Sequence, residues 1–142
     1  MKLTFFSQNQ TKNHPLPLFD TRVKAGFPSP ADDSIEARLD LNELIVKHPS
    51  ATFFVRVEGD SMEGANIYDG DILVVDRSIT ASNNKIVIAI LNGEFTVKRI
   101  SIEKNQITLL PENIQFPPLK ITKEMDFEIW GVVTHIIHKC TS

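Results

Sequence analysis

The chain has 142 residues and a formal net charge of -3, with 15 lysines and arginines against 18 aspartates and glutamates. This length fits a single domain, and hydrophobic residues, at 42%, are sufficient for a buried core. The acidic balance argues against a protein held to DNA mainly through phosphate contacts, so we expect no direct sequence-specific DNA binding. The only cysteine, Cys140, excludes an internal disulfide and a cysteine-rich zinc site.

The sequence contains no apolar run near the roughly 20 residues that a membrane-spanning helix needs. Its first residues also lack the long apolar stretch of a secretory signal. We therefore expect a cytoplasmic protein without membrane contact, and we expect neither a cofactor nor a metal.

Residues 1–25 differ from the rest of the chain in charge. They carry four basic side chains and one acidic side chain, whereas the remainder is net acidic. Pro15 and Pro17 interrupt both helix and sheet within this segment. We interpret residues 1–25 as an extended, weakly ordered and flexible arm, and residues 26–142 as the folded domain. A frayed terminus without any role is the alternative for the arm.

Two short helices are expected directly after the arm. The oxygens of Asp32, Asp33 and Ser34 are suited to cap a helix around residues 35–39. Asp40, with Glu43 three residues later, resembles a capping signal for a second short helix over residues 44–46.

From residue 50 onward the pattern is typical of β-strands. Asn92-Gly93 is a strong hairpin signal, because both central residues of a type I′ turn need positive φ. Gly131 is expected to mark a bulge within the last strand. The expected strands are 53–57, 72–75, 86–91, 95–100, 106–110 and 127–137. We therefore expect a compact, mostly β domain.

Ser61 and Lys98 are the candidate chemical groups. Ser61 follows a predicted strand in Gly59-Asp60-Ser61-Met62, which taken alone is a common turn composition. Strand alternation places Lys98 on a mostly apolar face, where lost hydration would lower its pKa. A neutral lysine within hydrogen-bond reach could take the proton of a serine hydroxyl. The alternative is a lysine at a sheet edge with its ammonium group in water.

The other polar residues suggest structural roles. His135 and His138 are three residues apart in a predicted strand, so they should face opposite sides and not share a metal. Asp69, Asp71 and Asp76 suit a turn and a strand end better than an acid-base pair.

Several short motifs occur in order along the chain. They are Gly59-Asp60-Ser61-Met62, Ile67-x-Asp69-Gly70-Asp71, Val75-Asp76 and Gly93-Glu94-x-x-Val97-Lys98-Arg99. Together they resemble the LexA-type Ser-Lys self-cleaving proteins. The upstream stretch Lys24-Ala25-Gly26-Phe27-Pro28-Ser29-Pro30-Ala31 is similar to the UmuD branch of that family, which includes the MucA, ImpA and RumA types. The resemblance extends from about Val23 to His138.

This resemblance implies a LexA/UmuD-like β-rich catalytic domain that acts as an autocatalytic serine endopeptidase. Ser61 would be the nucleophile, Lys98 its general base, and Ala25-Gly26 the scissile bond in the protein's own arm. Backbone N–H groups of Asp60 and Ser61 would stabilise the oxyanion. Met62 would help to form the substrate cleft.

The resemblance also implies a role in the SOS response. Cleavage would be promoted by the RecA filament on single-stranded DNA. The shortened homodimer would serve a UmuC-like Y-family polymerase in translesion synthesis. A repressor role is disfavoured, because a proline-broken arm of 25 residues cannot form a helix-turn-helix. Residues 16–19 resemble a sliding-clamp-binding peptide, although an apolar stretch docking on its own domain would look the same.

Two alternatives stay open. The first is a non-catalytic β-rich binding module such as an oligonucleotide-binding barrel, which predicts a groove of aromatic and basic side chains. The second is a degenerate relative that only dimerises and binds partners. The sequence does not decide between cleavage in cis and in trans.

Overall fold

The computed structural model describes residues 2–7, 15–19 and 35–141. The chain divides into two compact units, Met1–Gln8 with His48–Ser142, and Asn9–Lys47. No helix in the described ranges is both long enough and apolar enough to cross a membrane.

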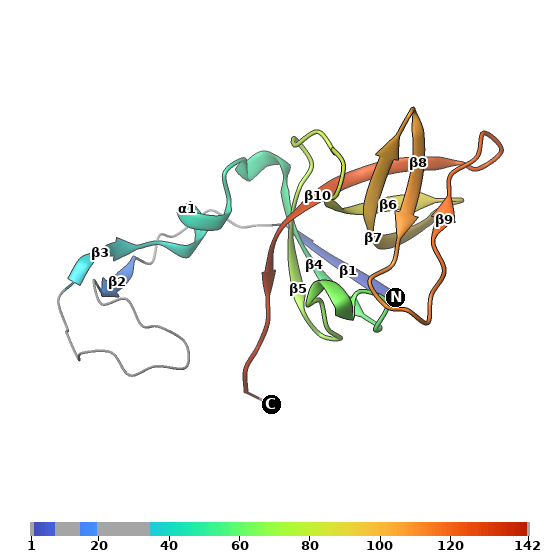
Figure 1. Ribbon diagram of the computed structural model, residues 1–142. Coiled ribbons are helices and arrows are strands. Elements are labelled where there is room, and N and C mark those ends of the chain that lie inside the picture. Colours follow the sequence, from blue (N-terminus) through green and yellow to red (C-terminus); the bar gives the residue numbers. More distant parts are fainter. Residues whose placement is uncertain (1, 8–14, 20–34, 142) are drawn as a thin grey trace. The chain divides into compact units, whose positions relative to one another are not determined.

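The larger unit is built on one eight-stranded sheet in the order β1-β4-β5-β10-β6-β7-β8-β9, in which all neighbours are antiparallel. Figure 1 shows the sheet curling so that β7 and β8 turn across β6. The mostly β class expected from the sequence is confirmed. The strands are β1 (Lys2–Ser7), β4 (Thr52–Glu58), β5 (Ile72–Asp76), β6 (Ile86–Leu91), β7 (Glu94–Glu103), β8 (Gln106–Leu110), β9 (Leu119–Lys120) and β10 (Phe127–Ile137).

The predicted hairpin and bulge both occur. Asn92 and Gly93 have φ angles of 50° and 82° and connect β6 to β7. The pairing of β10 with β6 shifts register between Ile129 and Gly131. A Cβ on Gly131 would lie 2.6 Å from Cγ1 of Val75, so the sheet approaches too closely here for any side chain.

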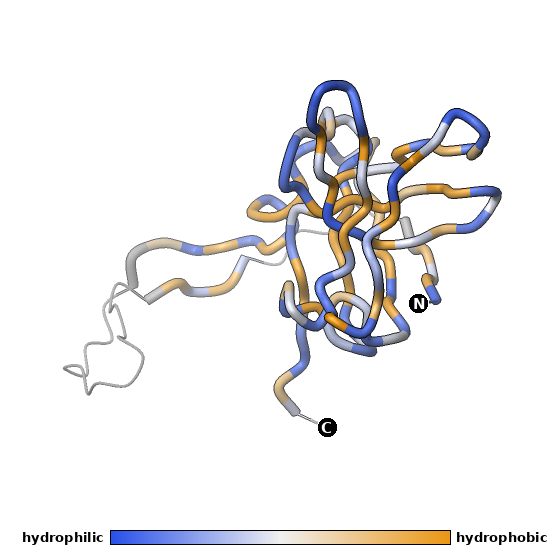
Figure 2. Tube along the Cα trace, turned by 45° about the vertical axis from the view of Figure 1, so that its right-hand side comes forward, coloured by the Kyte–Doolittle hydropathy of each residue, from blue (hydrophilic) through white to orange (hydrophobic). Residues whose placement is uncertain are grey.

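Apolar side chains of the strands form the core. Figure 2 shows the hydrophobic residues along the strands and the hydrophilic residues mainly at the turns. A second, smaller cluster contains Val87, Ile100 and Val132. The main cluster consists of Val55, Val57, Met62, Ile67, Leu73, Val75, Ile88 and Val97.

The smaller unit contains β2 (Leu16–Phe19), β3 (Ile35–Leu39) and α1 (Leu41–Ile45). The helix expected over residues 35–39 is wrong, because this segment is a strand paired with β2. Its apolar residues alternate with Glu36 and Arg38, which is the period of a strand. The second helix is confirmed, since Asp40 caps α1 by accepting a hydrogen bond from the Asn42 N–H at 3.0 Å.

Two segments of residues 1–25 form strands, which the sequence did not predict. Lys2–Ser7 forms β1 in the main sheet, and Leu16–Phe19 forms β2. Ala25 and Gly26, the capping residues 32–34 and the junction 27–31 lie outside the described residues. The boundary between residues 25 and 26 therefore stays a prediction.

Candidate active site

Ser61 lies on the loop that follows β4. Gly59 begins this loop with a φ of 111°, a left-handed conformation that favours glycine. Its N–H donates a 2.9 Å hydrogen bond to Oδ1 of Asp69, which fixes the exit of the chain from the strand. Ser61 itself is 5% exposed. A hydroxyl that is both buried and held on a fixed loop is well placed for directed chemistry.

The chain that follows β8 also holds the Ser61 loop through hydrogen bonds. The N–H of Glu112 donates to the carbonyl of Ser61 at 3.0 Å, and the N–H of Gly64 donates to the carbonyl of Glu112 at 2.5 Å. Nδ2 of Asn113 donates to the carbonyl of Asp60 at 3.0 Å. These bonds join the serine loop to the chain that follows β8 and limit the positions open to Ser61.

Lys98 lies in the middle of β7 and contacts Ser61. Its neighbour in the strand, Val97, is fully buried, and its cross-strand partner on β6 is the fully buried Val87. The Nζ atom of Lys98 donates to Oγ of Ser61 at 3.2 Å. Burial lowers the pKa of Lys98 from the ordinary lysine value, because desolvation disfavours the charged amine. The structure thus brings together the two groups that the sequence singled out.

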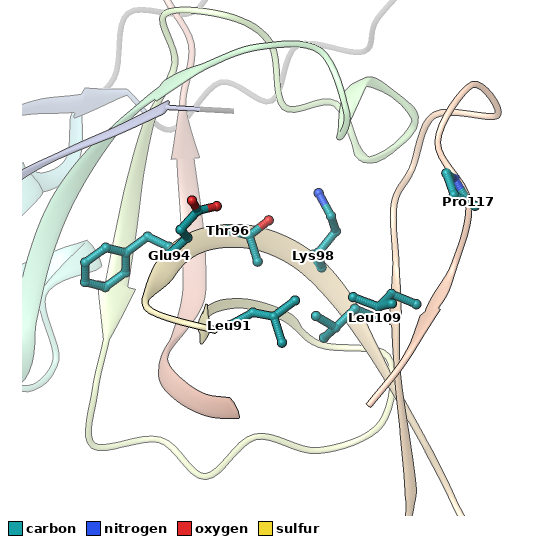
Figure 3. Close-up of a pocket in the computed structure, with 8 residues that line it drawn as sticks. Leu91, Glu94, Thr96, Lys98, Leu109 and Pro117 are labelled. Atoms are coloured by element: carbon teal, nitrogen blue, oxygen red, sulfur yellow. The ribbon is translucent and has the colours of Figure 1, made fainter. Parts of the chain in front are cut away.

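A groove of about 260 Å³ runs along β7 beside Lys98. Glu94, Thr96 and Lys98 project from the strand to the same side, and Leu91 and Leu109 lie on the other side of it (Figure 3). The groove is therefore apolar along one wall, with a carboxylate at one end and an amine at the other. Its lining residues are Leu91, Glu94, Phe95, Thr96, Lys98, Leu109, Pro117 and Leu119.

The remaining predicted site residues are placed differently. Met62 is fully buried in the main core cluster, and it does not belong to the residues that line the groove. Among the described residues, no oxygen accepts a hydrogen bond from the backbone N–H of Asp60 or of Ser61. Ala25 and Gly26 lie outside the described ranges.

The acidic residues have the structural positions expected of them. Asp71 is 2% exposed, accepts from the N–H of Tyr68, and pairs with Nδ1 of His138 at 2.6 Å. Asp76 is 3% exposed, accepts from Ser78, and pairs with Nδ1 of His48 at 2.5 Å. The Asp71 pair joins the start of β5 to the end of β10, and the Asp76 pair joins the end of β5 to the segment before β4. Within the described part of the chain, no group of three or more side chains that could hold a metal ion occurs.

Sequence reasoning did not find the segment that holds the serine loop. Arg99, next to Lys98 on β7, forms an ion pair with the carboxylate of Glu112. Glu112 therefore links the strand of the lysine to the loop of the serine. Arg99 and Glu112 are 13 residues apart in the sequence, and Asp60 and Asn113 are 53 residues apart. No local sequence pattern predicts contacts between residues so far apart.

Comparison with known proteins places this site in a family. Residues 17–134 match the family described as Peptidase S24-like, and this range contains Ser61, Lys98 and every residue that lines the groove. The chain is 48% identical over 137 residues to Protein MucA of Salmonella typhimurium, covering 95% of this chain and 93% of that protein. It is 44% identical over 134 residues to Protein ImpA of Shigella flexneri, covering 87% and 83%. It is 39% identical over 127 residues to the LexA repressor of Hahella chejuensis, covering 87% and 62%.

Proposed function

The chain belongs to the Peptidase S24-like family, in its UmuD-like branch, and from this premise we propose that it cleaves its own Ala25-Gly26 bond with Ser61 and Lys98. Membership of the family supports a self-cleaving serine protease role in the SOS response. The observation that carries the residue assignment is the 3.2 Å contact between Nζ of Lys98 and Oγ of Ser61. It also argues against a degenerate relative that has lost its chemistry.

The reaction begins with the neutral form of Lys98. The amine takes the proton from Oγ of Ser61 as the oxygen attacks the carbonyl carbon of Ala25. The tetrahedral intermediate then collapses, the C–N bond to Gly26 breaks, and the new amino group takes the proton from Lys98. Water hydrolyses the acyl-enzyme, which frees residues 1–25 and regenerates the serine. A lysine is sufficient as the base here, so the absence of a histidine from the pair is no obstacle.

The surroundings of Ser61 support this sequence of steps. The backbone N–H groups of Asp60 and Ser61 are proposed to receive the oxyanion. The apolar wall of the groove would accept the side chain of Val23, two residues before the scissile bond. Met62, which packs in the main core cluster next to Ser61 in the sequence, is proposed to help form the substrate cleft.

The control and the partners of the reaction follow from the family resemblance. We propose that the RecA filament on single-stranded DNA favours the docked arm, so that cleavage follows DNA damage. The shortened homodimer would then join a UmuC-like Y-family polymerase in translesion synthesis. The sliding clamp is a further proposed partner for residues 16–19. Leu16 is 63% exposed and Leu18 is 38% exposed on β2, which leaves both side chains accessible.

The assignment is tested by the intact mass of the purified full chain after incubation at alkaline pH. The wild-type protein is expected to give two fragments that divide after Ala25. Ser61→Ala and Lys98→Ala should each keep the full-length mass under the same conditions. Cleavage at that bond by either variant would contradict the assigned roles.

A further inference from the structure

The first strand of the chain is the end strand of the main sheet and covers the edge of β4. β1 pairs antiparallel with β4 over six residues, from Lys2 opposite Glu58 to Ser7 opposite Phe53. β4 has only β1 and β5 as neighbours, so without β1 it would itself be an edge strand. An uncovered edge presents a row of unpaired backbone N–H and C=O groups, which readily pair with another chain.

Side chains of β1 also pack against apolar residues beside the β4 edge. Leu3 and Phe5 pack against the main core cluster. The ring of Phe5 lies 4.6 Å from the ring of Phe95 on β7 and 4.8 Å from that of Trp130 on β10. β1 therefore contacts β7 as well as β4, and its loss would expose an aromatic surface together with the β4 edge.

We propose that self-cleavage turns the β4 edge into a docking site for an extended segment of a partner protein. β1 lies on the N-terminal side of Ala25-Gly26, so the proposed reaction cuts its covalent link to the sheet; the inference rests on the proposed function in this respect. In the intact chain, β1 is a tethered ligand whose effective concentration is on the order of millimolar. After cleavage it is a separate peptide at the protein's own concentration, and it is free to dissociate.

The residues of β1 define what the vacated edge accepts. Strand alternation turns Leu3 and Phe5 toward the core, whereas Lys2 and Thr4 are exposed. Lys2 stands opposite the acidic Glu58 at the start of the pairing. The partner segment is thus an added β-strand with a basic residue followed by apolar residues at alternate positions. Before cleavage this segment must compete with β1, which makes β1 an autoinhibitory strand.

The test uses a fluorescent peptide of residues 1–10 as the probe for the edge. It is titrated into three proteins: the processed wild type freed of its arm, the uncut Ser61→Ala chain, and an uncut Ser61→Ala chain that also carries Phe5→Asp. We expect the processed protein and the Phe5→Asp chain to bind the peptide at least tenfold more tightly than the Ser61→Ala chain. A peptide with Leu3→Asp and Phe5→Asp should bind none of them.

Amide hydrogen exchange supplies the second measurement. Residues 52–58 should exchange faster in the processed protein and in the Phe5→Asp chain, and the peptide should restore their protection. Exchange in β6 should not change, which shows that the sheet is intact. Phe5→Ala serves as a milder variant if Phe5→Asp does not fold.

Equal binding of the peptide to cut and uncut chains, or no binding to either with β6 protected, would overturn the docking proposal. If the wild type does not cut itself, the proposed function fails, while the two uncut chains still decide whether β1 masks the edge.

Discussion

At the scale of single residues, the proposed reaction depends on Lys98 and its lost hydration. The side chain lies on a strand next to the fully buried Val97 and opposite the fully buried Val87, and its amine contacts the hydroxyl of a buried serine. Desolvation lowers the pKa of Lys98 in the folded protein. Burial therefore makes the amine a usable base at moderate pH, and it also makes the protonated amine unfavourable in the folded protein.

Lys98→Met should stabilise the fold while it abolishes cleavage. Below the folded pKa of Lys98 the amine is protonated at a cost to stability, and this cost fades as the pH rises toward the unfolded value. Methionine has a similar length and no charge, so we expect a gain of up to about 1 kcal/mol at pH 7 in urea unfolding. The control is Lys85→Met, at an exposed position, which should leave stability within about 0.5 kcal/mol. A clear loss of stability in Lys98→Met would contradict this explanation.

Asp76, in contrast to Lys98, should stabilise the folded protein in its charged form. Burial tends to raise its pKa, but hydrogen bonds from Ser78 and the contact with His48 outweigh burial and lower it. A carboxyl with a lowered folded pKa adds stability that is present above the unfolded value and is lost as the pH falls through the folded value. Asp76→Asn should therefore cost about 1–3 kcal/mol at pH 7, and the difference from wild type should shrink below about pH 4. Thermal unfolding of both proteins across this range measures it, and a constant difference would count against the cause.

At the scale of elements, the active site depends on three segments that meet. β7 supplies Lys98, the loop after β4 supplies Ser61, and the chain after β8 holds that loop through Glu112. The carboxylate of Glu112 is in turn held by Arg99 on β7. The distance between serine and lysine is thus set by contacts outside the pair itself.

Gly64→Ala should disturb the serine without touching it. A Cβ at this position would lie 2.2 Å from the carbonyl oxygen of Glu112, so the two segments must move apart. We expect the cleavage rate to fall by about tenfold or more, because small displacements of reacting groups are costly. The pH at which the rate levels off should stay near that of wild type, since Lys98 keeps its burial. The control is Ser82→Ala, a substitution at an exposed position, which should leave the cleavage rate unchanged; if both variants cleave alike, Glu112 does not position the serine.

The strands were largely predictable from the sequence, and the contacts between loops were not. Apolar runs rich in β-branched residues indicated β4 to β8 and β10, and the Asn92-Gly93 turn fixed the β6–β7 pairing. The pairing of β2 with β3 was not predicted, because Asp32, Asp33 and Ser34 resemble helix caps, whereas the segment after them alternates as a strand does. The Ser61 and Lys98 pair was accessible through strand alternation and family motifs. The role of Glu112 was not predictable, since it depends on contacts between segments that are distant in the sequence.

At the scale of the whole molecule, the N-terminal residues that complete the sheet are the same residues that the proposed reaction cuts off. Lys2–Ser7 completes the sheet at the β4 edge, while the proposed cut at residue 25 separates this strand from the rest. Phe95 contacts Phe5 of β1 and also lines the groove beside Lys98. A change at the edge strand is therefore adjacent to one wall of the proposed active site.

Lys98 as the general base is tested most directly by the rate of self-cleavage of the full chain as a function of pH. Lys98 as the base predicts a rate that rises about tenfold per pH unit while the amine is mostly protonated, and that levels off once it is neutral. The plateau should begin below the pKa of an ordinary lysine, because burial lowers that of Lys98. Intact mass at timed intervals between pH 6 and pH 11 gives the curve. A rate that does not depend on pH, or an unchanged profile in Lys98→Ala, would contradict the account.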